Sequence, residues 1–298
     1  MSSVALLKAL RPLQWMKNGL VFLPFVFAVD IAWSTDDLEP VPALLFKLVI
    51  VALAFCALSS AVYLLNDLRD RSEDRLHPVK RDRPIASGKV STPIAGAALV
   101  VLAVSGLVVM TLVEPLLGLA GGLYSVIKFS YSFGLKQVVL LDAFAVTSGY
   151  VIRAVAGAVA IDVTASPWLY TTTGAGALFI VLGRRFAETR LAGGTGEKQR
   201  TVLKDYSGSF INQLLILSGA AAWLSYTLYT VEATNLPDNN TMLFTLPMVT
   251  FGLFRYLFLL NNNEQAEAPE QLIIQDLPLV LSIICWVAVS TLILLLNN

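Results

Sequence analysis

Charged residues are scarce in this sequence. Asp, Glu, Lys and Arg make up 14% of its 298 residues, whereas soluble domains carry about 25%. So few charges cannot cover a water-soluble surface of this size. This composition excludes a cytosolic globular protein, a disordered chain and a nucleic-acid-binding module.

Cysteine and histidine are scarce too. Cys56 and Cys285 lie far apart, each inside an apolar run, so they provide neither a disulfide framework nor zinc-site spacing. The single histidine, His77, precedes Pro78 and is expected to cap a turn or helix rather than bind a metal. Basic and acidic residues balance at 21 each, and this zero net charge by itself indicates no anionic partner.

Long apolar runs are what the sequence has in abundance. A bilayer crossing needs about 20 mostly apolar residues, and nine segments approach or exceed that length. Strands are not expected, because backbone polar groups in lipid must be satisfied within helices. We therefore predict an all-α polytopic membrane protein, in one domain over residues 1–298, with nine transmembrane helices near 18–34, 41–65, 92–113, 115–134, 138–160, 166–183, 210–231, 241–260 and 278–296.

The basic residues gather on one side of this predicted topology. Seven Lys and Arg residues follow the second span and six follow the sixth, whereas the connections of the opposite set carry only acidic residues. The positive-inside rule then predicts a cytoplasmic N-terminus and a C-terminus outside. One connection departs from the pattern, because residues 261–277 are acidic and Asn-rich. Two long, charged cytoplasmic loops, about 66–91 and 184–209, are the expected site of function.

The first of these loops suggests magnesium and phosphate chemistry. Its acidic residues Asp67, Asp70 and Asp74 are spaced three and four apart, which predicts one face of a helix continuing from the second span. Three carboxylates on one face repel each other unless a cation lies among them, and Mg²⁺ commonly bridges carboxylates and substrate phosphates. The alternative is a solvated loop with internal salt bridges. The neighbouring polar candidates are Asn66, a neutral ligand or donor, and the phosphate-binding Lys80, Arg81 and Arg83.

Two consecutive patterns resemble a known family. Asn-Asp-x-x-Asp-x-x-x-Asp over 66–74, followed by His-Pro-x-Lys-x-x-Arg-Pro-Ile over 77–85, is similar to the first aspartate-rich motif of the UbiA superfamily of membrane transferases. The resemblance implies a nine-helix UbiA-type bundle with a cytoplasm-facing active site. It also implies that the motif binds Mg²⁺ and a leaving diphosphate, with Asp67, Asp70 and Asn66 catalytic and with Asp67, Asp70 and Asp74 as metal ligands.

The second loop departs from the usual pattern of that superfamily. A second aspartate-rich motif is typical after the sixth span, but this chain has Gly183-Arg184-Arg185-Phe186-Ala187-Glu188 there. This segment resembles one branch, the decaprenyl-phosphate phosphoribosyltransferases. The segments 10–18, 131–136 and 150–158 are also similar to that branch.

The branch resemblance implies a reaction and a set of binding residues. A 5-phosphoribosyl group would pass from phosphoribosyl diphosphate to a polyprenyl phosphate of the decaprenyl type, with release of diphosphate. This would be a step toward arabinose donors for the cell wall, in a bacterial inner membrane. The expected substrate-binding residues are Lys17, Asn18, Lys80 and Arg83 for the diphosphate, Arg184 and Arg185 for the 5-phosphate, Glu188 for a second metal or a ribose hydroxyl, and Tyr131 and Lys136 near the site.

Alternatives remain at this stage. A UbiA-type prenyltransferase would use a polyprenyl diphosphate and an aromatic or lipid acceptor, although the missing second aspartate motif argues against it. A transporter is disfavoured, because the charges gather in loops rather than at the bilayer midplane. Lys128 and Asp142 are expected either to pair with each other or to contact substrate, and Arg153 either to meet the lipid phosphate or to close a hydrogen-bond network. The sequence is compatible with a homo-oligomer.

Overall fold

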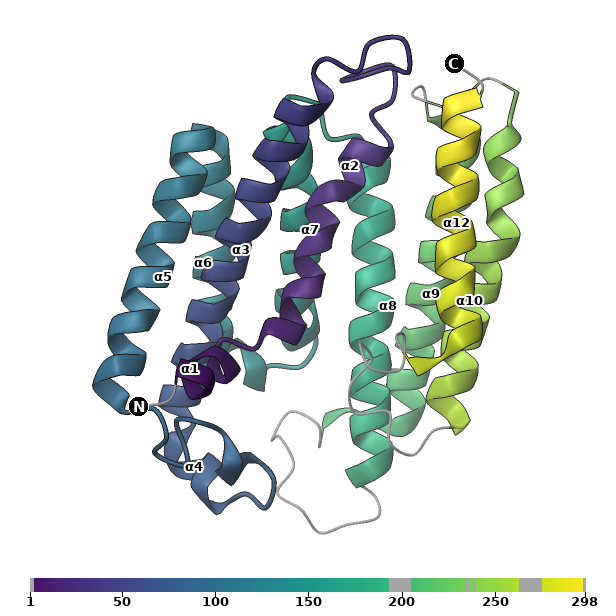
Figure 1. Ribbon diagram of the computed structural model, residues 1–298. Coiled ribbons are helices and arrows are strands. Elements are labelled where there is room, and N and C mark those ends of the chain that lie inside the picture. The colour runs from purple at the N-terminus through teal and green to yellow at the C-terminus, as the bar shows by residue number, and fades with distance from the viewer. Residues whose placement is uncertain (1–2, 193–204, 234–235, 238, 263–274, 297–298) are drawn as a thin grey trace. The chain divides into compact units, whose positions relative to one another are not determined.

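The computed structural model describes residues 3–192, 205–233, 236–237, 239–262 and 275–296 (Figure 1). Every regular element within these residues is a helix, apart from an isolated bridge between Val29 and Trp33. The prediction of an all-α protein is therefore confirmed. The chain forms two compact units: unit 1 comprises residues 1–23, 39–134 and 152–164, and unit 2 comprises 24–38, 135–151 and 165–298.

Several helices suit a membrane. Six segments in the described part of the chain are long and apolar enough to cross a bilayer, namely α3 (Val41–Arg69), α5 (Thr92–Val113), α7 (Leu141–Ala160), α9 (Gly208–Glu232), Thr241–Asn262 and α12 (Leu277–Leu296). The helices α6 (Pro115–Phe133) and α8 (Pro167–Ala192) are comparable in length but outside that set. The chain is a multi-pass membrane protein, and the count of nine spans stays a prediction.

Unit 1 is built around α3. This helix packs against α5 and α6 through the buried side chains of Phe55 and Leu58. The approach of α5 is so close that a Cβ atom on Gly106 would lie 2.9 Å from the Leu58 side chain. The shorter elements of this unit are α1 (Ser3–Ala9), the 3₁₀ helix η1 (Pro12–Phe22), α4 (Arg71–Leu76) and the 3₁₀ helix η2 (Lys80–Asp82).

The first predicted span takes a different form from the one expected. Regular structure begins at Pro12 as η1 and passes into a short helix, α2 (Leu23–Val26). The proline in α2, Pro24, lacks the N–H that a continuing helix needs. Polar contacts fix η1 along α3, because Trp15 Nε1 donates to Ser60 Oγ at 3.1 Å and Asn18 Nδ2 donates to Cys56 Sγ at 3.0 Å.

The aspartate-rich segment is not one continuous helix, which corrects the prediction. Helix α3 ends at Arg69, and Asp70, with φ −85° and ψ 6°, separates it from α4. The Arg69 guanidinium donates to the carbonyl oxygens of Ser132 and Phe133 at the end of α6. A cation at a helix C-terminus satisfies carbonyls that have no partner within the helix, so Arg69 ties the ends of α3 and α6 together.

Unit 2 contains α8, α9, η5 (Thr241–Thr245), α10 (Leu246–Asn262) and α12, together with η3 (Leu135–Gln137). Its core includes Phe179, Leu182, Ile211 and Leu260. Helix α8 runs on past the predicted span to Ala192, so the beginning of the second expected loop is helical. Residues 193–204 of that loop lie outside the described residues.

Candidate active site

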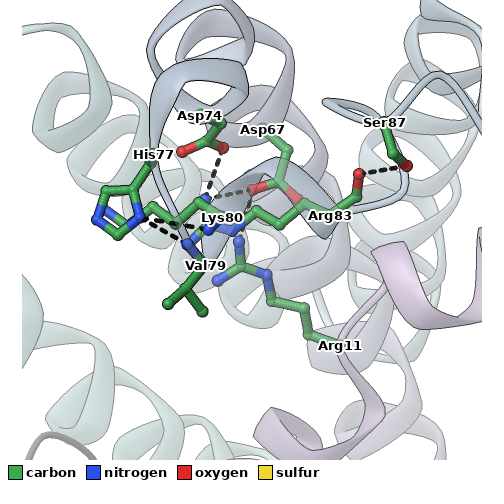
Figure 2. A network of polar contacts seen from close by, with 8 residues as sticks. All are labelled: Arg11, Asp67, Asp74, His77, Val79, Lys80, Arg83 and Ser87. Atoms are coloured by element: carbon green, nitrogen blue, oxygen red, sulfur yellow. Dashed lines mark hydrogen bonds and ion pairs between the residues drawn. The ribbon is translucent and has the colours of Figure 1, made fainter.

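Two arginines hold two aspartates, one near the end of α3 and one in α4 (Figure 2). Asp67 Oδ1 accepts hydrogen bonds from Arg11 Nη2 at 2.5 Å and from Arg83 Nη1 at 3.2 Å. The same Arg83 Nη1 lies 2.8 Å from Asp74 Oδ2. We call these four residues the aspartate–arginine network, and it brings together three residues of the expected site with a further residue, Arg11.

The charges of this network balance. The side chains of Asp67 and Asp74 are only 3% and 5% exposed, whereas that of Arg83 is 31% exposed. A buried carboxylate is costly unless it is paired and hydrogen-bonded, and here each carboxylate has a guanidinium partner. Cations of the chain itself therefore offset the charges of the two buried carboxylates.

The segment around Arg83 is held by local contacts. His77 ends α4, and its Nδ1 accepts hydrogen bonds from the backbone N–H groups of Val79 and Lys80 at 3.2 and 3.3 Å. Its expected capping role is thereby confirmed. Downstream, Ser87 Oγ donates to the Arg83 carbonyl at 2.8 Å, and the buried Ile85 packs in a cluster that includes Ala5 and Leu64.

The remaining candidates of the first motif are neighbours of Asp67, Asp74 and Arg83 in the sequence. Asn66 is half-buried within α3, Asp70 is half-buried at the helix break, and Lys80 is exposed in η2. In the part of the chain that the structure describes, no three Asp, Glu, His or Cys side chains converge as a metal site. The predicted ligand set is therefore not a preformed cage. Mg²⁺ usually takes only one or two carboxylates and shares its other positions with substrate phosphates and water, and the hard oxygens of Asp67 and Asp74 fit that chemistry.

A second buried network in unit 1 joins η1 to α7. Asn18 Oδ1 accepts from Arg153 Nε at 2.6 Å, and Arg153 Nη2 donates to Tyr124 Oη at 3.0 Å. All three residues are less than 5% exposed, and the Lys128 ammonium lies 5.7 Å from the centre of the Tyr124 ring. Of the two roles considered for Arg153, the structure supports the hydrogen-bond network. Sequence reasoning missed Tyr124, because a tyrosine within a membrane helix gives no specific signal.

The arginines after the sixth predicted span form a third network, in unit 2. The buried Arg185 donates through Nε to Asp142 Oδ2 at 2.7 Å and through Nη1 to Glu188, while Arg184 Nε reaches Glu188 Oε1 at 3.0 Å. Asp142, for which Lys128 or a substrate was expected, is thus held by Arg185. The Arg184 side chain is 41% exposed and that of Arg185 only 3%, so the more accessible of the two guanidiniums is that of Arg184.

Tyr206 completes the unit 2 network. Its hydroxyl donates to Asp142 Oδ1 at 2.8 Å and accepts from the Leu140 N–H at 2.8 Å. Burial, reinforced by the neighbouring Asp142 carboxylate, raises the pKa of Tyr206 to about 12. The tyrosine therefore stays a neutral hydrogen-bond donor at any physiological pH.

The expected site residues fall into both units. Unit 1 holds Lys17, Asn18, Asn66, Asp67, Asp70, Asp74, Lys80, Arg83 and Tyr131, and unit 2 holds Lys136, Arg184, Arg185 and Glu188. Lys17, Tyr131 and Lys136 are half-buried in η1, α6 and η3.

Comparisons with known proteins show the family to which the chain is related. A profile of the UbiA prenyltransferase family matches residues 21–187. The chain is 33% identical over 290 residues to a decaprenyl-phosphate phosphoribosyltransferase of Mycolicibacterium smegmatis. The alignment covers 95% of this chain and 90% of that protein. It is 35% identical over 281 residues to the protein of that name from Mycobacterium tuberculosis, covering 94% of this chain and 91% of the relative.

Solved structures show a similar fold. A UbiA homologue from Archaeoglobus fulgidus, bound to DMAPP and Mg²⁺, aligns with a TM-score of 0.72 at 17% identity, covering 97% of this chain and 98% of the other. At that identity the likeness concerns the fold.

Proposed function

The chain belongs to the UbiA prenyltransferase family, and from this we propose that it is a magnesium-dependent polyprenyl-phosphate phosphoribosyltransferase. The donor is phosphoribosyl diphosphate, the acceptor is a decaprenyl-type phosphate, and the product serves the synthesis of arabinose donors for the cell wall. Support comes from the two mycobacterial relatives, because each is named a decaprenyl-phosphate phosphoribosyltransferase and aligns along nearly the whole chain.

The observation that carries the proposal is the arginine-rich end of α8. A prenyl diphosphate has its phosphates at one place only, whereas phosphoribosyl diphosphate has a second, separate phosphate. The Arg184 side chain is 41% exposed, and Glu188 keeps it beside Arg185. A guanidinium in this setting suits a phosphate monoester, and the acidic cluster of a second metal site is missing from the sequence there.

The reaction needs little acid–base chemistry. An oxygen of the lipid phosphate forms a bond to C1 of the ribose, the bond from C1 to the diphosphate oxygen breaks, and diphosphate leaves with the electron pair. The attacking phosphate is already an anion, so a strong general base is unnecessary. The main requirement is to stabilise charge that accumulates on the leaving group.

Different residues of the chain bind the metal, the diphosphate and the 5-phosphate in this proposal. Asp67, Asp70 and Asp74 would hold Mg²⁺, which supplies charge neutralisation to the leaving diphosphate when bound. Lys17, Lys80 and Arg83 hold the diphosphate, Asn66 orients a ligand of the site, and Arg184 holds the 5-phosphate. Asn18 keeps Arg153 in place, because both ends of its amide are engaged in unit 1. The site faces the cytoplasm, where the water-soluble donor is found.

A transfer assay tests the function. Purified protein is given labelled phosphoribosyl diphosphate with decaprenyl phosphate and, separately, a polyprenyl diphosphate with 4-hydroxybenzoate. We expect label to enter lipid in the first mixture and to require Mg²⁺. Product in the second mixture alone would instead support a prenyltransferase.

Replacing the buried Asp67 tests the site. Asp67→Asn removes the charge that would hold the metal, so we expect kcat/KM to fall by about 100-fold or more. Asp82→Asn is the matched control, since Asp82 is an exposed carboxylate in η2, and it should retain full activity. Full activity of Asp67→Asn at saturating Mg²⁺ would refute the assignment.

A further inference from the structure

Arg83 contacts both buried carboxylates of the aspartate–arginine network through a single atom. We propose that Arg83 is an exchangeable counter-ion that couples metal binding to donor binding. Its guanidinium neutralises Asp67 and Asp74, and it transfers to the donor diphosphate when Mg²⁺ takes those carboxylates. The inference rests on the proposed function for the identity of the metal and the donor.

The geometry leaves Arg83 equipped for such a transfer. Nη1 lies 3.2 Å from Asp67 Oδ1 and 2.8 Å from Asp74 Oδ2, so one corner of the guanidinium makes both ion pairs. Nε and Nη2 take no part in these two contacts. An arginine offers a fork of donors that matches phosphate oxygens in a bidentate manner. Figure 2 shows the guanidinium in contact with both carboxylates.

Mg²⁺ and Arg83 compete for the same acceptor atoms. Asp67 Oδ1 already accepts from two guanidiniums, and a metal ion needs lone pairs of the same carboxylates. The network is also neutral as it stands, with two carboxylates and two guanidiniums. A divalent cation added to it would leave buried positive charge without a partner. A diphosphate resolves both conflicts, because it brings negative charge and new acceptors for Arg83.

Arg11 is suited to remain in place during the exchange. Its guanidinium carbon lies 4.8 Å from the centre of the Tyr63 ring, and its backbone, at φ 55° before Pro12, is fixed between α1 and η1. Arg11 Nη2 also lies closer to Asp67 Oδ1, at 2.5 Å, than Arg83 Nη1 does, at 3.2 Å. Arg11 therefore keeps the buried Asp67 paired while Arg83 moves.

Exchange of this kind makes the two ligands bind cooperatively. Mg²⁺ alone must displace Arg83 without compensation, whereas Mg²⁺ with the donor gives Arg83 a new partner. By linkage, the donor tightens Mg²⁺ binding by the same factor as Mg²⁺ tightens donor binding, and such factors are commonly about 5–150-fold. Arg83→Gln removes the competing cation, so Mg²⁺ alone should bind more tightly and the coupling should shrink.

Calorimetry on the full chain in detergent tests this directly. Mg²⁺ is titrated with and without saturating phosphoribosyl diphosphate, for wild type, Arg83→Gln and Lys89→Gln. Lys89→Gln is the matched control, since it removes one exposed cation from the same segment. We expect wild type and Lys89→Gln to show a coupling factor of at least about 5. We expect Arg83→Gln to bind Mg²⁺ alone more tightly, to bind the donor more weakly, and to lose most of the coupling.

Other results would overturn the exchange. Arg83→Gln that stays folded, as judged by its thermal transition, but binds Mg²⁺ alone more weakly would show that Arg83 is a structural ion pair. Should Arg83→Gln fail to fold, Arg83→Lys takes its place. It keeps the competing charge but loses the fork, so Mg²⁺ alone should bind as in wild type while the donor binds more weakly. Equal donor binding by Arg83→Lys and wild type would also refute the proposal.

The same titration separates this inference from the proposed function. Inorganic diphosphate replaces phosphoribosyl diphosphate as a second probe. Coupling with inorganic diphosphate but not with phosphoribosyl diphosphate would support the exchange and contradict the phosphoribosyl donor. Transfer of labelled phosphoribosyl to lipid by wild type, with coupling unchanged in Arg83→Gln, would support the function and refute the exchange.

Discussion

Asp142 is the residue on which three segments of unit 2 meet. It lies at the start of α7 with no exposed surface and accepts from Arg185 of α8 and from Tyr206, which precedes α9. The Tyr206 hydroxyl in turn accepts from Leu140, whose φ of 68° places it in the left-handed region. A branched residue there is strained and persists only where its surroundings hold it, so Tyr206 helps to fix the turn before α7.

Removing the Tyr206 hydroxyl should destabilise the protein in a pH-dependent manner. Tyr206→Phe leaves the Leu140 N–H and one Asp142 oxygen short of a partner, at a cost of about 1–3 kcal/mol. The folded pKa of Tyr206, about 12, lies above the value of about 10 for a tyrosine in an unfolded chain. The contribution of the hydroxyl is therefore complete below pH 10 and is lost as the pH rises through about 10 to 12.

Unfolding measurements in detergent at pH 8 and pH 11 test this sign. The difference in the free energy of unfolding between wild type and Tyr206→Phe should be smaller at pH 11 than at pH 8. The control is Tyr170→Phe, because Tyr170 is 41% exposed in α8, and this variant should match wild type at both values. A difference that grows with pH would contradict the hydrogen bond to Asp142.

The sequence allowed the aspartates of the site to be predicted, but not their partners. Asp67 and Asp74 share a motif of nine residues, so spacing alone nominates them. Arg83 follows them in the same loop, but Arg11 is 56 residues away from Asp67. Similarly, 43 residues separate Asp142 from Arg185. Contacts between distant segments depend on tertiary packing, which residue spacing within one element does not report.

Helix boundaries could likewise be predicted only where they depend on the local sequence. The apolar runs predicted 92–113 and 115–134, and the structure has α5 at Thr92–Val113 and α6 at Pro115–Phe133. Hydropathy reports where a helix lies in lipid, so it succeeds where the helix and the apolar run end together. It fails for α8, whose last turns are charged, because a helix that leaves the membrane looks like a loop by composition. Arg190 stabilises this extension by donating to the carbonyls of Leu260 and Asn261.

Two glycines of α5 test the packing of that helix on α3. A Cβ at Gly106 would lie 2.9 Å from Leu58 Cγ and Cδ2 and 3.1 Å from the Ala54 carbonyl oxygen, whereas at Gly96 nothing lies within 4 Å. Gly106→Ala should therefore force α5 away from α3 and destabilise the protein by about 1–3 kcal/mol. Gly96→Ala should be neutral or stabilising by up to about 1 kcal/mol, because alanine is the better helix former.

Thermal unfolding in one detergent compares these two variants. They make the same chemical change in one helix, so the difference between them isolates the contact with α3. Gly106→Ala also presses on the helix that carries Asp67, so we expect its transfer activity to fall with its stability. Equal transition temperatures for both variants would show that α5 and α3 do not pack this closely.

At the scale of the whole molecule, the zero net charge is a sum over unlike regions. Six basic residues lie between α3 and α5, but the connection from α5 to α6 holds only Glu114. The aspartate–arginine network and the exposed Lys80 and Lys89 all come before α5 in the sequence. The composition indicates a membrane protein, and the placement of its few charges favours phosphate chemistry on one face.

Helix α5 provides a direct test of that orientation. Lys89 and Glu114 are both exposed and flank this helix, whose 22 residues span about 33 Å and so match a hydrocarbon core of about 30 Å. The positive-inside rule puts the basic flank in the cytoplasm. In a background of Cys56→Ser and Cys285→Ala, we expect a membrane-impermeant maleimide to label Glu114→Cys in intact cells. Lys89→Cys should react only after permeabilisation. The reverse pattern would invert the topology and move the proposed site to the outside, and labelling of both positions from one side would show that α5 does not cross the membrane.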